Sequence, residues 1–159
     1  MAAVDINEAL PIAFELGGTL TINDGTDTCT VFNIEPGSME VDPGGYEPRV
    51  YQDRGANKTP LKGKARESVI KFRVKDSKAM TETKGIFALA SQTDSTGVVK
   101  TFTVVIKIPH AGVGGTAGDQ ITFTGCYFEP YPKRVPGAEF DIIDVTMRST
   151  DPVGTPTTY

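Results

Sequence analysis

The chain has 159 residues and a formal net charge of −4, which allows one ordinary domain and is short for two. No apolar stretch approaches the roughly 20 residues of a membrane-spanning helix, and residues 1–10 lack the basic start and apolar core of a signal peptide. We therefore expect no membrane partner. One His and two Cys cannot build a zinc site of the usual spacing.

The first third of the chain predicts an arm followed by short strands. Residues 1–12 are Ala-rich and acidic and contain Pro11, which predicts a flexible N-terminal arm. A strand is predicted over 13–22, with Leu20 and Ile22 on one face. Asn-Asp-Gly at 23–25 favours a hairpin turn, so the partner strand should follow over 29–34.

A short strand at 39–41 is bounded by two turn signals and precedes a long segment without a clear period. Residues 46–67 are polar and basic, and we expect a long loop over 43–67 that carries no regular structure. Loops of this length in a compact domain are usually functional, and many of them contact partners.

The segment after this loop alternates strictly and predicts a half-buried strand over 69–74. Its apolar face holds Ile70, Phe72 and Val74, and its outer face is basic. The one helix candidate spans 81–92, with Thr81 as its N-cap. Gly85 weakens this helix by up to about 1 kcal/mol relative to Ala.

Three long strands are predicted over 98–108, 120–128 and 140–148, and residues 151–159 form a Pro- and Thr-rich tail that should be extended. The fold class is therefore mainly β: a β-sandwich or open barrel with one short flanking α-helix and a long inter-subunit loop. Residues 13–150 form its single domain. We expect Cys29 and Cys126 to be buried, reduced thiols; a disulfide across a sheet is the alternative.

Charge is strongly segregated along the chain. Residues 1–48 contain nine acidic residues and no Lys or Arg, whereas residues 49–84 contain eleven basic and four acidic residues. The remainder has five basic and seven acidic residues. Such segregation says little about the fold, but it bears on association with partners.

The basic segment supplies the candidate contact residues. They are Arg49, Arg54, Lys58, Lys62, Lys64 and Arg66, followed by Lys71, Arg73 and Lys75. One interpretation is nucleic-acid binding through phosphates, although few aromatic residues accompany the cations. A second is docking onto the acidic N-terminal third of an identical neighbour. A third is an ordinary solvated face.

No pattern indicates an enzyme, a cofactor or a metal site. His110 lies in a turn without a recognisable partner, and we expect an exposed loop histidine. The glycine-rich stretch 112–118 does not match a phosphate-binding loop and precedes a strand, so it predicts a flexible connector. Glu139, Asp141 and Asp144 are expected on a solvated strand, the first two on one face and Asp144 on the other.

The order, size and composition of these elements resemble the major tail tube proteins of long-tailed, siphovirus-like bacteriophages. The resemblance rests on the loop 47–67, the strand 68–75, the helix near 81–92, the strand 98–108, the strand that contains Gly125-Cys126-Tyr127, and the final strand 141–148. It spans residues 13–152, carries no diagnostic short motif, and the chain is too short for the extra immunoglobulin-like domain of some members.

The resemblance implies rings of six copies, stacked head to tail into a tube that conducts DNA during infection. Residues 43–67 would be the inter-ring loop, and Thr, Gly and Asp positions on the long strands would line the channel. The implied partners are further copies of the chain, the terminator, tape measure and distal tail proteins, and passing DNA. The location would be the virion tail, assembled in the cytoplasm of a bacterial host.

Other classes compatible with the sequence are a capsid decoration protein, a head–tail connector, or a β-sandwich module that binds carbohydrate or nucleic acid. The 13 aromatic residues and the lack of Trp argue against a sugar-binding platform. Assembly behaviour separates these classes, because a tube protein polymerises in rings and a binding module usually stays small.

Overall fold

A computed structural model describes residues 17–159 except 33, 78–84, 93–96, 111–116 and 138. In chain order its elements are β1 Thr19–Asn23, β2 Thr28–Val31, β3 Glu40–Asp42, β4 Tyr46–Gln52, β5 Lys58–Ala65, β6 Ser68–Lys75, α1 Ile86–Ala90, β7 Phe102–Pro109, β8 Gly118–Phe128, β9 Lys133–Val135, β10 Ile142–Ser149 and β11 Thr155–Thr158. The predicted arm, Thr81 and most of the glycine-rich stretch lie outside the described residues.

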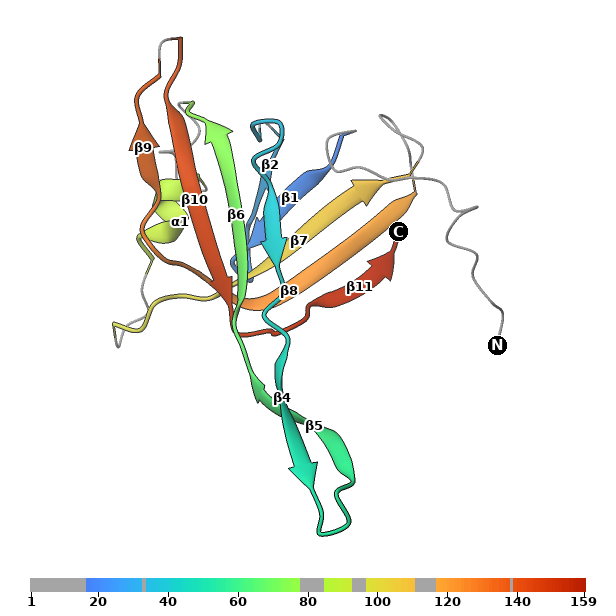
Figure 1. The fold of residues 1–159 in the computed structure, drawn as a ribbon. Coiled ribbons are helices and arrows are strands. Elements are labelled where there is room, and N and C mark those ends of the chain that lie inside the picture. The colour runs from blue at the N-terminus through green and yellow to red at the C-terminus, as the bar shows by residue number, and fades with distance from the viewer. Residues whose placement is uncertain (1–16, 33, 78–84, 93–96, 111–116, 138) are drawn as a thin grey trace.

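Nine strands form one antiparallel sheet that folds over on itself at strands β8 and β10 (Figure 1). One half has the order β2-β1-β7-β8-β11 and the other β9-β10-β6-β3, because β8 pairs with β10 only through residues 126–128. Buried side chains from both halves join in one apolar cluster. The prediction of a mainly β fold with one short helix is confirmed.

Strict alternation places the core side chains of the second half. Along β6 the buried residues Ile70, Phe72 and Val74 alternate with exposed Lys71 and Arg73, as the sequence predicted. Strand β10 contributes three more buried apolar residues, at 143, 145 and 147. Each such side chain stabilises the fold by about 1.5–3 kcal/mol relative to leaving it in water.

The alternation fails at one place in β8, since strict alternation along the predicted strand 120–128 would put Phe123 and Cys126 on opposite faces. Both are fully buried, because Gly125 adopts a φ of 62° and inserts an extra residue into the strand. The register with β7 shifts at the same level, which marks a β-bulge. A side chain at Gly125 would meet Thr150 Oγ1, so glycine is required there.

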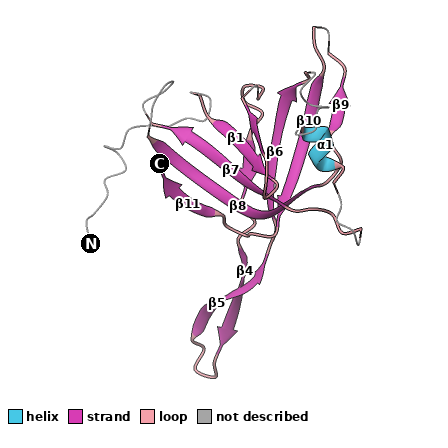
Figure 2. Ribbon diagram, turned by 180° about the vertical axis from the view of Figure 1, so that it is seen from behind, coloured by secondary structure: helices cyan, strands magenta, loops and turns pink. Residues whose placement is uncertain are grey.

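The helix is shorter than the predicted 81–92. Helix α1 begins after Gly85, which has an extended backbone, and it buries Ile86 and Leu89 against the core. Phe87 contacts Tyr131 beside β9. The helix therefore packs on the core beside β9 and β10 (Figure 2).

The prediction of a loop without regular structure over 43–67 is wrong for most of this segment. Strands β4 and β5 form a two-stranded hairpin that projects from the main sheet (Figures 1 and 2). The C-terminal tail also contains a strand, since β11 pairs with residues 119–122 of β8. The prediction contained no strand corresponding to β9.

Both cysteines are free, Cys29 half-buried and Cys126 buried. Burial raises the pKa of the Cys126 thiol to about 11. In the described part of the chain, no helix is both long and apolar enough to cross a membrane.

Candidate assembly surfaces

The β4–β5 hairpin is almost entirely exposed. Its strands pair only with each other, from Tyr46 opposite Ala65 to Gln52 opposite Lys58, and none of their residues is buried. A two-stranded hairpin alone in water is at best marginally stable. Its faces are therefore places where contact with another molecule would add stability.

Apolar side chains stand on both faces of the hairpin. Val50 is 63% exposed, Tyr51 60% and Leu61 50%. Val50 lies opposite Pro60, while Leu61 lies opposite Arg49 on the other face. Clustered exposed apolar groups of this kind mark interaction surfaces.

All six candidate contact residues lie on this hairpin or at its root. Arg66 Nε lies 3.2 Å from Glu47 Oε1, and Lys62 Nζ lies 3.8 Å from the centre of the Tyr46 ring, so these two cations fasten the hairpin itself. Within the described residues, no carboxylate pairs with Arg49, Arg54, Lys58 or Lys64. These four are free to contact a partner.

Hydrogen bonds hold the root of the hairpin in a fixed position. The Gly45 N–H donates to Pro152 O at 2.8 Å, and Ser68 Oγ donates to Asp151 O at 2.6 Å. Tyr127 Oη donates to the Glu67 carboxylate at 2.8 and 2.9 Å. Desolvation, and next the bond to Glu67, raise the pKa of the Tyr127 phenol. Nothing in the sequence indicated that Asp151 and Pro152, at the start of the C-terminal tail, would contact this root.

The outer face of the β2-β1-β7-β8-β11 half is rich in threonine. One cross-strand row contains Thr30, Thr21, Val105, Thr122 and Thr155 in order across five strands. The face also holds Thr19, Thr28, Thr103, Thr124 and Thr157. On these five strands its one charged side chain is Lys107, which lies over the Tyr159 ring at 5.0 Å.

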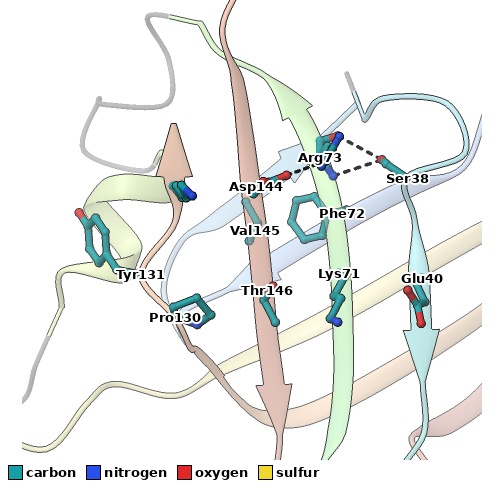
Figure 3. Close-up of a pocket in the computed structure, with 11 residues that line it drawn as sticks. Ser38, Glu40, Lys71, Phe72, Arg73, Pro130, Tyr131, Asp144, Val145 and Thr146 are labelled. Atoms are coloured by element: carbon teal, nitrogen blue, oxygen red, sulfur yellow. Dashed lines mark hydrogen bonds and ion pairs between the residues drawn. The ribbon is translucent and has the colours of Figure 1, made fainter. Parts of the chain in front are cut away.

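The outer face of the other half is charged, with the signs alternating. Arg73 Nε lies 2.7 Å from Asp144 Oδ1, and Lys71 stands directly opposite Glu40. A groove of about 400 Å³ runs over this face (Figure 3), and Ser38 Oγ accepts from the Arg73 N–H at 3.1 Å beside it. Lys71, Arg73 and Lys75, which the sequence grouped with the hairpin cations, lie on β6 and outside the hairpin.

The other residues considered for catalysis or metal binding do not come together in one site. His110 lies in a turn after β7, as predicted, but it is half-buried, and its Nε2 lies 3.0 Å from Asp119 Oδ1 in β8, a partner that the sequence did not indicate. Glu139 and Asp141 precede β10 and do not share a strand face, whereas Asp144 lies within it. Among the described residues, no group of three His, Cys, Asp or Glu could hold a metal ion.

No protein-family model and no curated protein sequence matches the chain. The fold, by contrast, is shared with solved components of phage-tail-like particles. The sheath/tube terminator of an extracellular contractile injection system (PVC) in its extended state has a TM-score of 0.66 and 10% identity, over 96% of this chain and 99% of that one.

Two further cryo-EM structures have the same fold. The sheath–tube complex of the same PVC system gives a TM-score of 0.57 and 11% identity, over 97% of this chain and 93% of that one. The tube-terminating cap of the anti-feeding prophage gives 0.63 and 9%, over 99% and 97%. At these identities the likeness establishes the fold.

Proposed function

We propose that the chain is a structural subunit of a phage tail or phage-like tail, which stacks in rings, hexameric as in tail tubes, to form a channel for DNA. The observation that carries this proposal is the exposed β4–β5 hairpin, with unpaired cations and apolar side chains on a root that is fixed to the sandwich. Such a projection reaches a neighbouring copy and gains stability from it. The shared fold of tube-associated structures supports the same function.

In this proposal the threonine-rich face forms the channel wall. Rows of hydroxyl and methyl groups with a single lysine offer almost no charge to phosphates, whereas binding of DNA depends mainly on Lys and Arg contacts. DNA would therefore slide along this face without being held. The charged outer face of the other half would then lie away from the channel.

The proposed location is the tail of a virion or similar particle, assembled in a bacterial cytoplasm. The proposed partners are further copies of the chain, the terminator, the tape measure and the distal tail protein. The alternating charges of the groove over β6 and β10 suit a polar contact with such a protein partner.

A second candidate function is that of the terminator, a single ring that closes the end of a tube. It is favoured by two of the three structures described above, which are a terminator and a terminating cap and have the higher TM-scores of the three. A terminator would use the hairpin to contact a different protein, whereas a tube subunit would use it to contact its own copies.

Negative-stain electron microscopy of the purified chain at low and high salt tests both functions. Tubes that assemble more slowly in high salt are expected for a tube subunit whose stacking contact is steered by charge. Isolated rings at every protein concentration would identify a terminator. Monomers without a central hole under all conditions would contradict both functions and favour a decoration protein or a binding module.

A further inference from the structure

Strand β6 joins two opposite ends of the molecule. Its first residue, Ser68, follows the hairpin, and its last residue is Lys75. A strand of this length spans about 23 Å from its first to its last residue. At that far end, Glu35 N–H donates to Arg73 O on one side, and Asp76 N–H donates to Asp141 O on the other. The turn between β2 and β3 and the segment before β10 therefore meet at the end opposite the hairpin (Figure 1). We call this the distal end.

The distal end has the chemical character that the hairpin lacks. Glu35, Glu139 and Asp141 have no ion-pair partner among the described residues, while Arg134 is occupied by Asp76 at 2.8 Å. Lys75 Nζ lies 4.7 Å from the centre of the Phe140 ring, a neutral group that leaves the positive charge of the ammonium in place. Three carboxylates without an ion-pair partner outnumber this one lysine, so the charge of the described residues at this end is negative.

Apolar groups and a hollow accompany these carboxylates. Phe140 is 41% exposed, and Phe32, just after β2, is 75% exposed. A hollow of about 310 Å³ is lined by residues 35–38 and Arg73. Exposed aromatic rings beside unpaired carboxylates are a surface that an apolar, cationic element fits.

We infer that the distal end receives the β4–β5 hairpin of a second copy of the chain. The hairpin supplies Arg54, Lys58 and Lys64 without internal partners, together with exposed Val50 and Leu61. Because the two surfaces differ and lie at opposite ends of one strand, each copy can dock on the next, and the contact repeats without closing. This inference rests on the proposed function and names the surface that completes the stacking contact.

The apolar contacts and the charges have different roles in this contact. Exposed ion pairs contribute little each, so the burial of Val50, Leu61 and the distal phenylalanines holds the copies together. The charges steer the hairpin to the distal end and oppose a docking of two like ends. Raising the salt concentration should therefore slow stacking more than it loosens stacks already formed.

The direct test is cross-linking between two copies that each carry one accessible thiol. In a Cys29→Ser background, Ala56→Cys marks the hairpin tip of one copy, and Ser77→Cys marks the distal end of the other. After mixing, a short bis-maleimide should join these two copies at least tenfold more efficiently than it joins Ala56→Cys to the matched control Thr157→Cys. Equal yields would overturn the inference.

Charge reversal supplies a second readout. Glu35→Lys, Glu139→Lys and Asp141→Lys together should lower the cross-linking yield at least tenfold, and adding Arg54→Glu, Lys58→Glu and Lys64→Glu to the hairpin copy should restore it. The control with the same charge change is Glu40→Lys, Asp42→Lys and Glu129→Lys. If the charge reversal at the distal end lowered the cross-linking yield no more than the control reversal does, the inference would be overturned.

Electron microscopy of the same samples separates this inference from the proposed function. Rings without the hairpin-to-distal-end cross-link would keep the ring assembly and reject the inference. The cross-link without rings would keep the inference and reject the proposed ring function. A loss of both would reject both.

Discussion

The sandwich and the hairpin are built from the same kind of backbone but are stabilised in different ways. Strands β6 and β10 bury a side chain at every second position, so their stability is internal to one copy. Strands β4 and β5 bury none, although three of their large apolar side chains are at least half exposed. One chain thus contains a region whose apolar side chains are packed within one copy and a region whose apolar side chains stay exposed.

The largest difference between the two regions should appear when an aromatic side chain is removed from each. Phe72→Ala removes a buried ring and should lower the free energy of unfolding by about 3–5 kcal/mol. Tyr51→Ala, on the hairpin, should change it by about 0.5 kcal/mol or less. Urea unfolding of the monomer measures both, and equal losses would show that the hairpin packs on its own sandwich.

The root, where the two regions join, should show an intermediate effect. Ser68→Ala leaves the Asp151 carbonyl without its hydroxyl donor and should cost about 1–3 kcal/mol. Ser91→Ala is the matched control, because Ser91 Oγ also donates to a backbone carbonyl but is exposed, and about 0.5 kcal/mol is expected. Indistinguishable unfolding midpoints for the two variants would contradict a fixed root.

Charge reversal on the hairpin should leave the sandwich unaffected and weaken assembly. Arg54→Glu, Lys58→Glu and Lys64→Glu together should raise the protein concentration needed for stacking about tenfold, equivalent to about 1.4 kcal/mol per contact. Sedimentation measures this concentration at low salt. The control reverses the charge of three lysines that lie away from the hairpin, Lys71, Lys100 and Lys133. An equal shift of the stacking concentration in this control would show that net charge alone causes the effect.

The smallest effect on folding, with a distinct effect on function, is expected at the threonine-rich face. Thr21→Lys with Thr122→Lys changes two side chains of one cross-strand row, and the monomer should lose about 1 kcal/mol or less. Assembled tubes of this variant should retain a short fluorescent DNA duplex that wild-type tubes release. Exclusion of the duplex by both proteins would contradict a channel wall at this face.

How far the sequence predicted the structure follows from the same comparison. The pattern of Ile70, Phe72 and Val74 predicted β6 because a face packed on a core selects alternating apolar residues. The hairpin has no core-facing side, so no period distinguished β4 and β5 from a loop. The bulge at Gly125 was missed because a single positive φ leaves no trace in composition.

The surfaces proposed for contact were visible in the sequence only in part, for similar reasons. The run of positive charge singled out the hairpin residues as candidates, since charge segregation is visible in the sequence. It could not separate Arg66 and Lys62, which fasten the hairpin, from the cations that remain free. The threonine-rich face and the distal end combine residues from distant segments, so only the strand register brings them together.

The position of β6 between the hairpin and the distal end also has a mechanical consequence. A pull on the hairpin along the strand direction acts on the antiparallel ladder of eight residue pairs between β6 and β10. In this geometry the hydrogen bonds are loaded in shear and must break together, whereas a pull across the strands would open them one after another. A stack of such subunits would resist stretching along its axis far better than peeling at its side.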